Sequence, residues 1–131
     1  LRHARNTISQ RAAKYKSRER LSMAATDIVI VLTTAPDDVR VEKWARILVD
    51  ERLAACVNVH GAMISFYRWK GVVERGAERQ VVIKTTRERV TALRTRLREL
   101  HSYELPEFLV LTVEEGSEEY LKWVAEQTRP H

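Results

Sequence analysis

Two long strand-like segments joined by a tight turn constrain the fold of this chain more than any other feature of its sequence. Residues 55–69 alternate apolar and polar side chains, Lys70-Gly71 supplies the turn, and residues 72–84 form the return segment. This pattern predicts one long antiparallel hairpin. We expect a bulge or a small excursion at residues 74–79, because the sequence ERGAER interrupts the return strand with a glycine and four charges.

The segments on either side of the hairpin predict one strand and two helices. Residues 27–34 are a β-branched apolar run of strand length, and residues 37–52 repeat apolar side chains at helical spacing. After the hairpin, helical spacing extends to residue 100. We expect this second helix to start with a capping box in Thr85-Thr86-Arg87-Glu88, whose hydroxyl and carboxylate would satisfy the first amides.

The last part of the chain completes a recognisable order of elements. Residues 108–113 predict a fourth strand, and a short helix is expected to follow Gly116 and Ser117. The resulting order, β-α-β-β-α-β with an extra C-terminal helix, predicts an α+β, ferredoxin-like domain over residues 27–131. Right-handed crossovers give the sheet order 4-1-3-2.

The length of the hairpin indicates that the domain associates with copies of itself. Its strands run to roughly a dozen residues, against about seven for the other two, so the hairpin is expected to extend beyond the sheet. The extension would expose Phe66, Tyr67 and Trp69 and leave strand edges unpaired in a monomer. A closed symmetric assembly would cover both.

The charge distribution argues against a polyanionic partner. The formal net charge is +5, but residues 1–27 hold seven basic and two acidic side chains, and the remaining residues are balanced. We therefore expect no nucleic-acid partner. No apolar run approaches the ~18 residues of a membrane-spanning helix, and the single cysteine excludes an intramolecular disulfide. No membrane partner is expected.

Residues 1–26 are predicted to be a basic leader outside the domain, because the composition changes sharply at Met23, which resembles a start codon. Three interpretations remain open: upstream or cloning-derived sequence, an organelle-targeting peptide, or a basic binding arm. We expect a cytoplasmic protein, or an organellar one if residues 1–22 are a native targeting leader.

Two sparse groups of polar residues are candidates for a functional site. The first holds Cys56 and Asn58, which share one face of a strand, and Lys84 at the end of the return strand. A lone cysteine in an apolar segment is more often a packed, inert thiol than a ligand. Lys84 could pair with a nearby glutamate or simply reach solvent.

The second group follows the second helix. His101 closes that helix, and Tyr103, Glu104 and Glu107 come within six residues, in a loop directed by Pro106. A histidine here could merely cap the helix. Imidazole with carboxylates also suits a divalent metal, and a thiolate from Cys56 would favour copper or zinc.

Five collinear segments closely resemble the CutA divalent-cation tolerance family: LTTAPD at residues 32–37, RLAACVN at 52–58, YRWKG at 67–71, IKT at 83–85 and HSYELPE at 101–107. The resemblance implies a homotrimer of ferredoxin-like subunits, similar in architecture to the PII-type signalling trimers. It also implies binding of copper or another divalent cation, with no organic cofactor and no established catalysis.

The resemblance places the candidate site in clefts between subunits, and the chain departs from the family pattern near that site at two positions. Ser102 stands where the family usually has proline, and Lys70 stands where an acidic residue is common. The matching site residues are Cys56, Trp69, Lys84, His101, Tyr103 and Glu104.

Three functions are weighed on these residues. The first is cation binding, with His101, Glu104 and Cys56 as ligands, beside cleft residues Lys84, Tyr103, Trp69, Glu107 and Asn58. The second is a PII-like signalling or interaction scaffold that binds a small ligand in the clefts. The third is an enzyme with Cys56 as nucleophile and His101 as base; no orienting group or oxyanion donor is recognisable for it, so we expect no enzyme.

Overall fold

The structure is a computed structural model that describes residues 27–131. The predicted leader, residues 1–26, lies outside the described residues. The elements follow the expected order: β1 (Ile28–Pro36), α2 (Arg40–Asp50), β2 (Cys56–Trp69), β3 (Val72–Thr86), the short 3₁₀ helix η1 (Arg87–Arg89), α3 (Val90–Leu100), β4 (Leu109–Thr112) and α4 (Glu118–Gln127). The four strands form one antiparallel sheet in the order β2-β3-β1-β4, which confirms the predicted ferredoxin-like topology.

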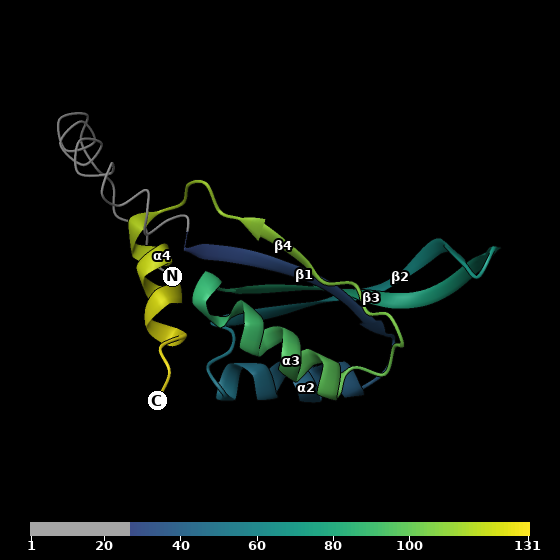
Figure 1. The fold of residues 1–131 in the computed structure, drawn as a ribbon, viewed down its shortest axis with the longest axis horizontal. Coiled ribbons are helices and arrows are strands. Elements are labelled where there is room, and N and C mark those ends of the chain that lie inside the picture. Colours follow the sequence, from purple (N-terminus) through teal and green to yellow (C-terminus); the bar gives the residue numbers. More distant parts are fainter. Residues whose placement is uncertain (1–26) are drawn as a thin grey trace.

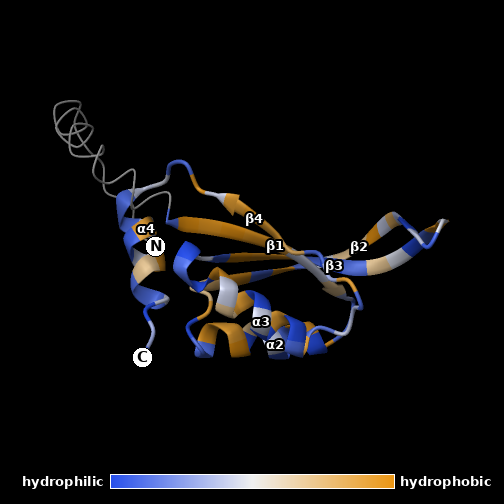
Figure 2. Cartoon of the chain, viewed as in Figure 1, coloured by the Kyte–Doolittle hydropathy of each residue, from blue (hydrophilic) through white to orange (hydrophobic). Residues whose placement is uncertain are grey.

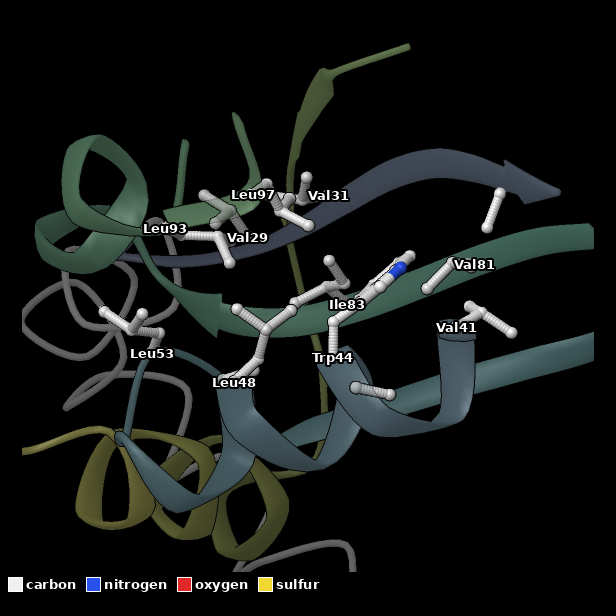
Figure 3. Packing of buried hydrophobic residues seen from close by; sticks show 13 residues of the cluster. Val29, Val31, Val41, Trp44, Leu48, Leu53, Val81, Ile83, Leu93 and Leu97 are labelled. Atoms are coloured by element: carbon white, nitrogen blue, oxygen red, sulfur yellow. The ribbon is translucent and has the colours of Figure 1, made fainter. Parts of the chain in front are cut away.

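One face of the sheet is covered by α2 and α3 (Figure 1). Alternate β1 residues, including Val29 and Val31, point into this layer and are fully buried. Helix α2 meets them with Trp44 and Leu48, one turn apart on its apolar face. Figure 3 shows these side chains interlocking with residues of β3 and α3. This layer is the main hydrophobic core.

Helix α4 packs at one end of the sheet and closes a smaller core. The buried members of this cluster are Ile28 from β1, Ala55 just before β2, and Val124 from α4. Ser117 caps the helix, because its side-chain oxygen accepts a hydrogen bond from the amide of Tyr120. The helix expected after Gly116 and Ser117 is therefore confirmed, and it begins at Glu118, directly after Ser117.

The expected bulge lies on the opposite strand from the one predicted. Strand β3 is regular through residues 74–79, whereas β2 holds an extra residue between Val59 and Ala62. The reason is that the segment 78–84 of β3 lies between β1 on one side and β2 on the other. A strand held on both sides cannot bend freely, so the irregularity falls on the edge strand. There the Arg79 guanidinium bonds to the His60 carbonyl at 2.7 Å.

The predicted capping box is also wrong. Thr85 belongs to β3 and is completely buried, and its hydroxyl donates to the carbonyl oxygen of Leu53 at 2.8 Å. Thr86 is the residue that precedes η1, and no side chain caps that helix. Because the hydroxyl of Thr85 faces the core, it needs a buried acceptor rather than a helix amide.

The second face of the sheet lies away from α2 and α3, and among the described helices only α4 packs near it, at the Ile28 end. Figure 2 shows β1 and β4 hydrophobic along most of their length. On the open face, Leu109 and Leu111 of β4 are about half exposed and lie opposite Leu32 and Ile30. Such a surface is typical of a contact between protein molecules.

The overhang of the hairpin is confirmed. Strands β2 and β3 have 14 and 15 residues, against 9 in β1 and 4 in β4, and the hairpin extends past the helices in Figure 1. Its exposed apolar side chains are Ile64, Phe66, Tyr67, Val72 and Val73. Between residues 27 and 131, no helix combines the length and apolar character that crossing a membrane requires.

Candidate functional site

His101 is held in one orientation at the end of α3. Its backbone turns to an extended conformation, which directs the chain away from the helix. The ring atom Nε2 lies 2.5 Å from the carbonyl oxygen of Thr34, and Nδ1 accepts the amide of Tyr103 at 3.1 Å. A nitrogen that accepts a hydrogen bond carries no proton, so we assign the neutral tautomer with its proton on Nε2.

Aromatic contacts surround this imidazole. The ring centroid of Tyr103 lies 4.6 Å from that of His101. The ring centroid of Trp44, on α2, lies 6.1 Å from that of His101. The Tyr103 hydroxyl donates to a carboxylate oxygen of Glu78 at 3.0 Å. Burial, followed by the negative charge and hydrogen bond of Glu78, raises the pKa of Tyr103 above its ordinary value. The phenol therefore stays protonated as a donor.

The two glutamates of the predicted site differ in their surroundings. Glu107 accepts a hydrogen bond from the side-chain amide of Gln80 at 3.1 Å, and the same amide nitrogen lies 2.7 Å from the Thr33 carbonyl. Glu104 is exposed, and its carboxylate has no hydrogen bond or ion pair with any residue of the described chain. Glu104 is thus the freer of the two.

The residues of the first candidate group lie together on the open face of the sheet. Cys56 is paired in register with Lys84, and the Lys84 ammonium donates to the side-chain oxygen of Asn58 at 2.8 Å. Lys84 therefore bonds an amide rather than a glutamate. A packed thiol is the more common outcome for a lone cysteine, but Cys56 is only partly covered within one subunit.

A single subunit does not bring the two groups together. Cys56 lies in the row of the sheet that contains Ile30, whereas His101 contacts Thr34, four residues further along β1. That separation is about 13 Å at the rise of an extended strand. Among residues 27–131, no three histidine, cysteine or acidic side chains cluster closely enough to hold a metal ion. Trp69 lies farther away at the hairpin end, with the Lys70 ammonium 5.6 Å from its ring centroid.

Sequence reasoning missed Glu78 and Gln80 as parts of this site. Glu78 bonds Tyr103 across 25 positions of sequence, and Gln80 bonds Glu107 across 27. Both precede the regular apolar end of β3, and the charged run around Glu78 suggested a bulge instead. The register with β1, which pairs Glu78 with Pro36 and Gln80 with Thr34, is the signal that places them beside the loop after α3.

Comparison with known proteins identifies the family. Residues 29–127 match the family model described as CutA1 divalent ion tolerance protein. The divalent-cation tolerance protein CutA of Thermus thermophilus is 41% identical over 99 residues, which is 76% of this chain and 96% of that protein.

Solved structures agree with this result. The crystal structure of CutA from Xylella fastidiosa superposes with a TM-score of 0.76 at 42% identity, covering 79% of this chain and 99% of that one. The PII-like protein CutA from Nostoc has a TM-score of 0.73 at 38% identity, with the same two coverages. The chain belongs to the CutA1 divalent ion tolerance family.

Proposed function

We propose that this protein binds a divalent cation, with copper the first candidate, as a homotrimer and without an organic cofactor. The observation that carries the proposal is the pair of contacts that the ring nitrogens of His101 make. Its Nε2–H group donates to the Thr34 carbonyl, so the lone pair belongs to Nδ1. Histidines that ligate metals usually have this arrangement, because a backbone acceptor on one nitrogen orients the other and makes it more basic.

The loop after His101 supplies further support for a cation. The Nδ1 atom accepts one hydrogen bond, from the amide of Tyr103 at 3.1 Å, and a metal ion bound there would replace it. Glu104 offers an exposed carboxylate three residues from His101. Imidazole and carboxylate together suit copper and zinc.

The trimer is proposed for two reasons. One subunit does not bring the candidate ligands together, and it leaves apolar surface exposed. The row of Cys56 and the Thr34 carbonyl that His101 contacts are about 13 Å apart along β1, so both side chains could ligate one ion only if two subunits contributed. The open face of the sheet and the overhanging hairpin provide apolar surface for that contact. In such an assembly Trp69, Tyr103 and Glu107 would line the cleft.

The test is a calorimetric titration of the intact protein with Cu²⁺ and Zn²⁺. His101→Gln keeps a donor for the Thr34 carbonyl but lacks the imidazole lone pair, and it should weaken Cu²⁺ binding at least tenfold. His60→Gln is the matched control, since His60 is an exposed histidine on β2 and should leave the affinity unchanged. Equal binding by both variants would contradict the proposal.

The same titration ranks the other two ligands. Glu104→Gln should weaken binding, because it removes the free carboxylate of the loop. Cys56→Ser should have a smaller effect than loss of His101, because the thiol is partly covered and reaches the ion only from another subunit. A sedimentation experiment at micromolar concentration that found only monomers would contradict the trimer.

A scaffold that binds a small anionic ligand is the second candidate function. Lys84 favours it, because its ammonium lies on the open face and is held by an uncharged partner, Asn58. One solved relative is itself called PII-like. Nucleotides and organic acids titrated beside the metals would distinguish the two. We propose no catalytic step, and a cytoplasmic location, which fractionation of the source cells would test.

A further inference from the structure

A small pocket opens between the second half of α3 and the chain segment that leads into β4. In Figure 1 this segment leaves the end of α3 and turns back along β1. The pocket has a volume of about 120 Å³. Its lining combines apolar, charged and hydroxyl groups and includes Thr33, Arg94, Leu97, Arg98, Glu107 and Phe108. The His101 side of the loop after α3 closes it.

Two arginines of α3 give the pocket its charge. Arg94 and Arg98 are one turn apart, and neither has a carboxylate partner within residues 27–131. Arg96, between them in sequence, bridges Glu51 and Glu99 instead. Like charges at this spacing repel each other, which the negative end of the helix dipole offsets only in part. An anion bound between the two guanidinium groups would remove the repulsion.

The floor of the pocket holds a buried hydroxyl with a poor hydrogen bond. Thr33 is only 1% exposed, and the sole hydrogen bond of its hydroxyl within the described chain reaches the Thr34 carbonyl at 3.5 Å. Hydroxyl donors normally lie 2.7–2.8 Å from their acceptors. The Thr33 hydroxyl therefore retains donor capacity toward a ligand in the pocket.

The other residues that line the pocket determine the charge and the apolar part of the anion that fits it. The Phe108 ring lies under the Arg94 guanidinium, 5.6 Å from its centroid, and with Leu97 forms an apolar wall. Glu107 contributes one negative charge, which the Gln80 amide holds. Two arginines against one glutamate leave a single positive charge for the ligand to neutralise.

We propose that this pocket binds a short aliphatic monocarboxylate. The guanidinium groups of Arg94 and Arg98 donate charge-assisted hydrogen bonds to the carboxylate. The Thr33 hydroxyl adds a neutral donor, and the alkyl chain packs on Leu97 and Phe108. The pocket borders the proposed cation site, because His101 also lines it. The contacts proposed for the carboxylate use Arg94, Arg98 and Thr33, so binding requires no metal.

Ligand-observed saturation-transfer NMR with sodium propionate tests the proposal on the intact protein in the presence of EDTA. Wild type should give a saturable signal, and Arg98→Gln should raise the Kd at least tenfold. Thr33→Val keeps the side-chain shape and should weaken binding severalfold. Arg46→Gln, which removes an exposed arginine of α2, is the control and should bind as wild type does.

Four results would overturn the proposal. The first is a propionate signal that does not saturate, and the second is an equal Kd for Arg98→Gln and wild type. The third is equal binding of propylamine, which has the alkyl chain without the carboxylate. The fourth is competition by inorganic phosphate that is as effective as propionate binding. Because EDTA removes divalent ions, none of these results bears on cation binding.

Discussion

Replacing Tyr103 with phenylalanine should destabilise the protein through one identifiable hydrogen bond. The phenol of Tyr103 donates to Glu78 at 3.0 Å and thereby ties the loop after α3 to β3. Phenylalanine keeps the ring and its contact with His101, whose centroid is 4.6 Å away. The substitution therefore removes the hydroxyl donor and little else.

The expected loss is about 1 kcal/mol in the free energy of unfolding. A hydrogen bond to a charged acceptor contributes about 1.5–3 kcal/mol when it is well buried. Tyr103 is only partly covered, so solvent screening reduces that contribution. A cycle that combines Tyr103→Phe with Glu78→Gln should give a coupling energy of similar size, because the two side chains share the bond.

The pH dependence follows from the raised pKa of Tyr103 in the folded state. Burial is the main cause and Glu78 the next, with smaller contributions from Tyr67 and Asp38. Because the unfolded phenol titrates near ~10, the folded state holds the proton more tightly. Its contribution is fully present below pH ~10 and is lost as the pH rises toward the higher folded value. The difference between wild type and Tyr103→Phe should shrink in that range.

Urea unfolding at pH 8, 10 and 11 measures these quantities. Tyr120→Phe is the control, because Tyr120 is also partly buried and stacks on Trp123, and its hydroxyl has no partner among residues 27–131. It should change stability by no more than a few tenths of a kcal/mol. A loss for Tyr103→Phe no larger than that of the control, or a coupling energy near zero, would refute the reasoning.

Three further predictions concern stability and assembly. Arg52 adopts a left-handed conformation with φ of 58°, so Arg52→Gly should be more stable than Arg52→Ala by about 1 kcal/mol in urea unfolding; equal stabilities would contradict this. Trp69→Ala should cost about 3 to 5 kcal/mol per subunit if a neighbour buries the ring, and sedimentation should show a weakened assembly. Deleting residues 1–22 should leave the melting temperature unchanged, because the described fold comprises residues 27–131; a lower value would assign the leader a structural role.

The element order could be predicted because its signals are local. The apolar run of β1, the Lys70-Gly71 turn and the helical spacing after Val90 can each be recognised within a short stretch of sequence. The turn is confirmed in detail, since both of its residues have positive φ. Local patterns of this kind decide which face of an element is buried.

The errors arose where a distant partner decides the outcome. The bulge moved to β2 because β3 is held between two strands, and Thr85 served the core rather than the helix because its hydroxyl faces Leu53. The setting of His101 depends on Thr34, 67 residues away in sequence. Sequence spacing identified His101 as a candidate and could not give the tautomer, because the tautomer depends on which group each ring nitrogen meets.

The fold also explains why the polar chemistry lies at the margins of the subunit. Helices α2 and α3 fill one face of the sheet with apolar side chains, so charged groups there would lose their hydration without a partner. The loop after α3 and the open face of the sheet escape that constraint. Glu78, Glu104 and Lys84 occupy these places, where water or another subunit can satisfy them. Contacts between subunits would bring the loop after α3 of one subunit close to the open sheet face of another. The proposed assembly and the proposed cation site therefore depend on the same contacts.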